Sequence, residues 1–106
     1  MNQNDPPTEH ILACLSSSPS NAKIVRTAAT MAKAFGGTFT ALYVRTPDSD
    51  QMGKEDCRRL QQHIRMAEQA GADISTIYGD DIPQQIAEFA RISGITKIVL
   101  GRSSVH

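Results

Sequence analysis

Three consecutive hydroxyl side chains, Ser16, Ser17 and Ser18, follow directly after the apolar run 11–15. A strand that ends in three hydroxyls and passes into a helix offers hydroxyl oxygens and backbone N–H groups to a polar ligand. Tyr43, in a second apolar segment, can bring a phenol back beside them. No nucleophile–base pair accompanies these groups, so the pattern indicates a ligand-sensing site in preference to a catalytic one.

An arginine and a further hydroxyl follow the fourth predicted strand, whose carboxyl end is expected to lie at the same edge of the sheet as the serines. Ligands of open parallel sheets bind outside the carboxyl ends of the strands, where the strand order reverses. If the first and fourth strands are neighbours, Gly101, Arg102 and Ser103 face the serine turn, residues 16–18. Such a set suits an anion, and Arg45 is a candidate second cation. The alternative for each residue alone is a helix cap or a solvated surface charge.

The elements that must position these residues can be recognised from hydrophobic patterning. Four segments rich in apolar and β-branched residues are predicted to be strands: 11–15, 38–44, 72–78 and 96–101. The third carries Asp73, Ser75 and Thr76, and this polarity suits an edge position. Helices between strands demand parallel pairing with right-handed crossovers. The predicted fold class is therefore α/β, an open, mostly parallel, doubly wound sheet in the order βαβαβαβ.

The first of three predicted helices follows the serine turn. Ser18 can cap it, with Pro19 in its first position. Gly36 and Gly37 can end it, because glycine adopts the left-handed conformation without a Cβ clash. Apolar residues recur at three- and four-residue spacing, which predicts a core-facing stripe. The members of this stripe are Ile24, Val25, Ala28, Met31, Ala32 and Phe35.

The second and third predicted helices are also amphipathic. The second covers 54–70, with a narrow apolar stripe made of Cys57, Leu60, Ile64 and Ala67. Asp81 can cap the third helix, and Gln84 completes a capping box. Four apolar residues of the third helix are expected to face the core, namely Ile82, Ile86, Phe89 and Ala90.

Size and charge limit the classes of protein that this chain can represent. It has 106 residues, a formal net charge of zero and 40% hydrophobic residues, enough for one small domain with a single core. Residues 1–9 are expected to be a flexible lead-in to a single domain over 10–106. A neutral balance removes the electrostatic argument for contact with nucleic acid or membrane. Because the apolar fourth strand would form a bare edge, we expect a fragment that lacks a fifth strand.

Cysteine and histidine usage predicts neither a disulfide nor a metal site. Cys14 falls in the first apolar run, where it can serve as a small buried hydrophobe. Cys57 falls in a polar helix, and nothing else suggests an oxidising compartment, so we expect a cytosolic domain. His10, His63 and His106 are scattered, without the close spacing that a metal site requires. No apolar run is long enough to span a bilayer, and no signal peptide is visible.

The segments ILACLS at 11–16 and IVLGRS at 98–103, within the βαβαβαβ order, resemble the universal stress protein fold, which is adenine nucleotide alpha hydrolase-like. More closely, SPSNAK at 18–23, YVRTP at 43–47 and KIVLGRS at 97–103 resemble the universal stress protein domain of Kdp-type sensor histidine kinases. The resemblance implies a regulatory, cytoplasmic and non-catalytic domain of a two-component membrane protein that controls potassium uptake. The catalytic histidine and ATP-lid motifs of such a kinase are absent from this sequence, so the kinase activity would belong to the parent protein.

One subgroup of these kinase domains is known for binding the second messenger cyclic di-AMP through S-x-S, twenty residues, and then F-T-A-x-Y. The resemblance therefore implies six ligand-site positions here: Ser16, Ser18, Phe39, Thr40, Ala41 and Tyr43. Phe39 and Ala41 can also act by shaping the strand instead of touching the ligand. Arg102 and Ser103 join this set from the crevice argument alone.

Other functions remain open at this point. The domain can be an interaction module that docks a universal stress protein or another part of the kinase, without nucleotide, through its bare edge strand. It can also bind ATP, as ordinary family members do. Those members carry an aspartate at the end of the first strand, where this sequence has Leu15 and Ser16, and a glycine-rich run after the fourth, of which only 101–104 remains. A hydrolase has the least support.

Overall fold

A computed structural model describes residues 9–100 and contains one four-stranded parallel sheet. The strands are β1 (His10–Cys14), β2 (Thr38–Arg45), β3 (Asp73–Tyr78) and β4 (Lys97–Val99), in the order β3-β2-β1-β4. All three pairings are parallel, which confirms the predicted α/β class and places β3 at an edge. The strand order reverses between β1 and β4, as expected of a doubly wound sheet.

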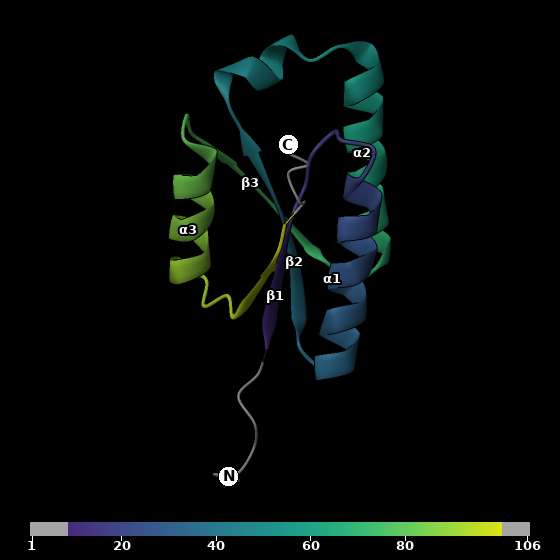
Figure 1. Ribbon diagram of the computed structural model, residues 1–106, viewed down its shortest axis with the longest axis vertical. Coiled ribbons are helices and arrows are strands. Elements are labelled where there is room, and N and C mark those ends of the chain that lie inside the picture. Colours follow the sequence, from purple (N-terminus) through teal and green to yellow (C-terminus); the bar gives the residue numbers. More distant parts are fainter. Residues whose placement is uncertain (1–8, 101–106) are drawn as a thin grey trace, which may run out of the picture.

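The helices cover the two faces of the sheet unequally. In Figure 1, α1 (Asn21–Phe35) and α2 (Lys54–Gln69) lie on one face, and α3 (Ile82–Ile92) lies alone on the other. Right-handed crossovers explain this arrangement. The chain moves outward from β1 to β3 through α1 and α2, and then returns through α3 to pair β4 with the opposite side of β1. A short 3₁₀ helix (Pro47–Gln51) joins β2 to α2.

The core lies on both faces of the central strand. Ile11, Leu12 and Ala13 of β1 are fully buried, as the continuous apolar run predicts. Because side chains alternate along a strand, Ile11 and Ala13 pack beneath α1 and α2. Leu12 packs with Leu42 and Val44 of β2 on the face covered by α3.

The first helix begins later than its sequence pattern predicts. The prediction placed Ser18 at the cap and Pro19 in the first turn, but α1 begins at Asn21, after Ser20. The hydroxyls of Ser18 and Ser20 bond to each other over 3.0 Å, and the N–H of Asn21 donates to the carbonyl of Ser18 over 2.9 Å. Local turn bonds have therefore taken the place of a helix cap.

The end of α1 is well predicted except for its last side chain. Gly36 adopts the left-handed conformation at φ +65° and accounts for the stop. Gly37 must lack a side chain, because a Cβ there would collide with the backbone carbonyl oxygen of Glu9. Phe35, predicted to face the core, is 51% exposed, and the Lys97 ammonium lies 5.2 Å from its ring centroid. A cation over the ring covers part of an aromatic face that the core does not reach.

The apolar stripes of α2 and α3 differ in detail from prediction. Cys57 is exposed, whereas His63 is buried beside Leu60 on the face that meets the sheet. Asp81 caps α3 by accepting a hydrogen bond from the N–H of Gln84 over 3.2 Å, as predicted. The reciprocal bond of a capping box does not occur between these two described residues. Ile82, predicted to face the core, is the first residue of α3 and is 44% exposed.

Candidate ligand-binding site

A pocket of about 560 Å³ opens at the carboxyl edge of β1 and β2. Three segments form its walls: the serine turn, the end of β2 with the following residues 46–52, and the start of α3. Its lining includes Ser16, Ser18, Tyr43, Asp48, Ile82 and Leu100. This carboxyl-edge pocket lies outside the carboxyl ends of the strands, as expected for a ligand site of an open α/β sheet. Its strand lining comes from the ends of β1 and β2, whereas the strand order reverses between β1 and β4, and only Leu100 follows β4 into the lining. A second groove of about 700 Å³, lined by Lys33, Phe39 and Asp73 among others, lies at the opposite edge.

The hydroxyls of the serine turn are organised by backbone donors. The oxygen of the Ser16 hydroxyl accepts a hydrogen bond from the N–H of Ser18 over 3.2 Å. The Ser18 hydroxyl accepts from the N–H of Ser20 over 3.4 Å and pairs with the Ser20 hydroxyl. Since the Ser16 oxygen accepts here, its own proton is left to donate outward. The arrangement can therefore present hydrogen-bond donors to an acceptor in the pocket.

Asn21 holds the two ends of the turn together. Its side chain is almost fully buried, at 4% exposure. The amide oxygen accepts from the N–H of Ser16 over 3.1 Å, and the amide nitrogen donates to the carbonyl of Cys14 over 2.8 Å. One side chain thus satisfies a partly buried donor and a partly buried acceptor where β1 ends, which fixes the entry into the serine turn.

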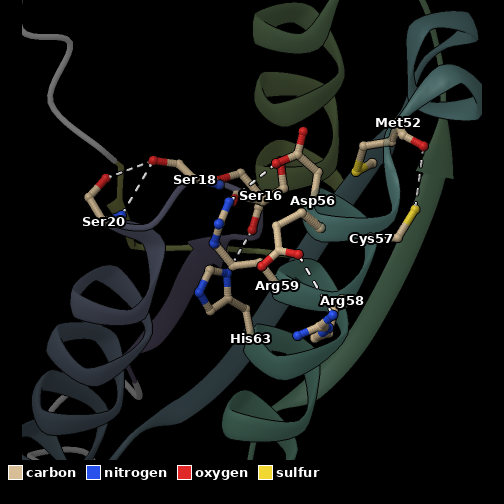
Figure 2. A network of polar contacts seen from close by, with 11 residues as sticks. Ser16, Ser18, Ser20, Met52, Asp56, Cys57, Arg58, Arg59 and His63 are labelled. Atoms are coloured by element: carbon tan, nitrogen blue, oxygen red, sulfur yellow. Dashed lines mark hydrogen bonds and ion pairs between the residues drawn. The ribbon is translucent and has the colours of Figure 1, made fainter.

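Helix α2 contacts the same turn from outside the pocket. His63, 4% exposed, donates from Nδ1 to the carbonyl oxygen of Ser16 over 2.7 Å. Arg59 donates from Nη1 to the carbonyl oxygen of Ser17 over 3.1 Å and also bonds to the Asp56 carboxylate over 3.2 Å. Figure 2 shows both side chains reaching from α2 toward the turn.

The universal stress protein family model matches residues 7–105. The chain belongs to the universal stress protein family. It is 38% identical over 96 residues to Sensor protein KdpD of Clostridium acetobutylicum, covering 91% of this chain. It is 30% identical over 92 residues to Sensor protein KdpD of Escherichia coli K12, covering 87% of this chain. The chain spans about a tenth of the length of each of these curated relatives, at 10% in both cases.

Solved universal stress proteins share the fold at lower identity. A family member from Burkholderia pseudomallei superposes with a TM-score of 0.70 at 19% identity, covering 92% of this chain and 85% of that one. A universal stress protein in complex with cAMP superposes with a TM-score of 0.66 at 14% identity, covering 88% of this chain and 71% of that one. Among residues 9–100, none of the helices combines the length and hydropathy that a membrane span needs.

The universal stress protein domain gathers three of the predicted site residues around one pocket: Ser16, Ser18 and Tyr43. The other three strand positions of the motif, Phe39, Thr40 and Ala41, do not line it. Phe39 and Ala41 are buried beneath α1 and α2, and Phe39 also borders the groove at the opposite edge. Thr40 lies between them on the strand and is half-buried. Arg102 and Ser103 lie outside the described residues.

The second cation predicted for the site is directed elsewhere. Arg45 pairs with the Asp50 carboxylate over 2.8 Å, and its guanidinium lies 5.6 Å from the centroid of the Tyr78 ring. It does not line the pocket. The nearby carboxylate and ring give this arginine partners outside the pocket, at the edge of the sheet formed by β3. Among the described lining residues, Asp48 bears the only formal charge.

Three supporting residues of the universal stress protein domain were not predicted as part of the site: Asn21, Arg59 and His63. One signal was available for His63, since it stands three residues after Leu60 and four before Ala67, on the buried stripe of α2. A histidine on such a stripe needs a hydrogen-bond partner. The partner is a backbone carbonyl, which no side-chain pattern in the sequence can identify.

The two thiols are expected to differ strongly in reactivity. Burial raises the pKa of Cys14 from 9.0 to about 11, whereas Cys57 is exposed. At pH 8 the thiolate fraction of Cys14 is therefore lowered roughly a hundredfold, and thiolate is the reactive form. Alkylation followed by mass spectrometry should label Cys57 first, with Cys14 accelerating about tenfold per pH unit up to about 11. Equal labelling at pH 8 in the folded protein would contradict this assignment.

Proposed function

We propose that this domain binds cyclic di-AMP in the carboxyl-edge pocket and regulates an attached sensor kinase that controls potassium uptake. The observation that carries the proposal is the meeting of Ser16, Ser18 and Tyr43, far apart in sequence, around one pocket. The similarity to Sensor protein KdpD, at 38% and 30% identity over most of the chain, supports the regulatory role. This role requires no chemistry from the domain itself.

The physical character of the pocket supports a nucleotide as its ligand. Its volume of about 560 Å³ falls within the range of small-molecule sites, about 300–1,000 Å³. Ser16 and Ser18 supply hydroxyl donors on one side, and Ile82, Ile86 and Leu100 supply apolar surface on another. Phosphate oxygens suit the first surface and the faces of adenine rings suit the second.

Regulation requires that the ligand favour one state of the full-length protein. A ligand with equal affinity for two conformations shifts neither. In this proposal the complex of cyclic di-AMP with the domain stabilises the conformation in which the kinase is less active, so the messenger lowers potassium-uptake signalling.

Isothermal titration calorimetry of the purified domain tests the binding step. We expect saturable heat with cyclic di-AMP at ligand concentrations below about 1 mM. Cyclic di-GMP serves as the matched control, because it carries the same phosphates with a different base, and it should bind more weakly. The absence of heat with cyclic di-AMP, in a sample whose circular dichroism shows a folded domain, would exclude this function.

A second candidate is an adenine mononucleotide. The solved universal stress protein in complex with cAMP shares this fold with a TM-score of 0.66, and that observation favours the candidate. Competition separates the two possibilities. If cAMP or ATP displaces labelled cyclic di-AMP at equal or lower concentration, the mononucleotide is the better ligand. If cAMP or ATP displaces labelled cyclic di-AMP only in large excess, the cyclic dinucleotide is the better ligand.

The charge on Asp48 is expected to oppose an anionic ligand. Asp48 is exposed at the pocket rim, so its effect on a phosphate is screened by water. Asp48→Asn should strengthen cyclic di-AMP binding about twofold at low salt, and the gain should disappear at high salt. Asp73→Asn, the same change at the opposite edge of the sheet, is the control and should leave affinity unchanged. Weaker binding by Asp48→Asn would instead indicate that the carboxylate accepts a hydrogen bond from the ligand.

A further inference from the structure

Two consecutive carbonyl groups of the serine turn are held by one face of α2. His63 donates to the carbonyl of Ser16 over 2.7 Å, and Arg59 donates to the carbonyl of Ser17 over 3.1 Å. The two donors are four residues apart, so they project from the same side of the helix. Figure 2 shows the side chains of His63 and Arg59 extending from α2 toward the serine turn.

These two bonds fix the direction of the backbone donors. A peptide unit is planar and trans, so the N–H that follows a carbonyl points the opposite way. With the carbonyls of Ser16 and Ser17 drawn toward α2, the N–H groups of Ser17 and Ser18 are directed away from it. The N–H of Ser18 in turn bonds to the Ser16 hydroxyl over 3.2 Å and sets its orientation. The groups offered to a ligand therefore depend on a helix that does not line the pocket.

We propose that His63 and Arg59 are positioning residues of the ligand site, which act through the backbone carbonyls of Ser16 and Ser17. This inference rests on the proposed function for its ligand, but not for its geometry. A carbonyl oxygen can only accept, so Nδ1 of His63 carries a proton, and the burial of the ring shields the bond from water. Asp56 holds the guanidinium of Arg59 over 3.2 Å and limits its rotation.

Paired substitutions separate positioning from simple packing. His63→Leu removes the donor and keeps an apolar side chain in the buried site, whereas His63→Asn restores an N–H at the place of Nδ1. Arg59 is partly exposed, so Arg59→Met gives a second variant that is expected to fold. Arg58→Met is the matched control, because Arg58 contacts Glu55 over 3.7 Å and lies one residue away on the exposed side of α2.

Two readouts are needed, one of them without ligand. In two-dimensional ¹H–¹⁵N NMR of the free domain, His63→Leu and Arg59→Met should shift the amide resonances of residues 17 and 18, and Arg58→Met should not. In calorimetry with cyclic di-AMP, each of the first two variants should bind about tenfold more weakly, the equivalent of one hydrogen bond. His63→Asn should recover most of the affinity.

The outcomes distinguish this inference from the proposed function. Unchanged amide resonances in folded His63→Leu and Arg59→Met would overturn the positioning role, whatever the ligand is. The positioning role would also be overturned if both variants bound cyclic di-AMP with wild-type affinity, or if His63→Asn failed to recover binding. If the wild-type domain binds no cyclic di-AMP, the proposed function fails, and the amide resonances alone then decide whether α2 positions the turn.

Discussion

Replacing Ser16 and Ser18 together by alanine is expected to weaken the binding of cyclic di-AMP about a hundredfold or more. Hydrogen bonds to a charged group contribute about 1.5–3 kcal/mol each, and every 1.4 kcal/mol is a factor of about ten in affinity. Both side chains line the carboxyl-edge pocket. The Ser16 change also removes the acceptor of the Ser18 N–H, so the loss includes a backbone contribution. Calorimetry of the double variant measures the total.

A hydroxyl deletion elsewhere provides the comparison. Ser93→Ala removes an exposed hydroxyl after the end of α3, away from the pocket, and should leave affinity within error of wild type. Tyr43→Phe tests the phenol alone and should cost less than the double change. If the Ser16 and Ser18 double variant is folded and binds within threefold of wild type, the serine turn is not the ligand site.

Asn21→Ala is expected to lower the free energy of unfolding by about 3 kcal/mol, the largest effect on stability that we predict for a single polar side chain. The amide is buried and serves the N–H of Ser16 and the carbonyl of Cys14 at once. Its removal leaves a donor and an acceptor without partners at the end of a central strand, and each such group costs about 1–3 kcal/mol. Urea denaturation followed by circular dichroism measures the change.

Gln62→Ala is the matched control for this prediction. It also deletes a carboxamide from a helix, but Gln62 is exposed on α2 and its loss should change stability by less than about 0.5 kcal/mol. A loss of under about 1 kcal/mol in Asn21→Ala would mean that water replaces the amide at both backbone groups.

The sheet could be predicted from sequence because its signals are local. The apolar run 11–15 specifies a central strand, and the polar residues of 73–76 specify an edge. Gly36 ends α1 through a conformation that its own backbone dictates. The carboxyl edge as the site of the pocket also followed from the predicted topology, and Ser16 and Tyr43 do meet there.

The parts that sequence could not supply depend on contacts between distant elements. The start of α1 moved from Ser18 to Asn21 because the serines bond to one another. Arg45 was predicted near the ligand but does not line the pocket, because it pairs with Asp50 and lies over the ring of Tyr78. His63 supports the site from outside the pocket, because it donates a hydrogen bond to the backbone carbonyl of Ser16, 47 residues away. Side-chain patterning reports burial, and it cannot report which carbonyl a buried donor will meet.

Helix α3, alone on its face of the sheet, is expected to open locally more readily than α1, and ligand binding should change this opening. None of its residues is buried, although Ile86 and Phe89 pack against the sheet, so its local opening should cost little free energy. Its backbone amides should therefore exchange with deuterium sooner than those of α1, which buries four residues. Ile82 and Ile86 also line the pocket. A ligand seated there would slow deuterium uptake in α3, so the backbone amides of this helix would report occupancy of the site.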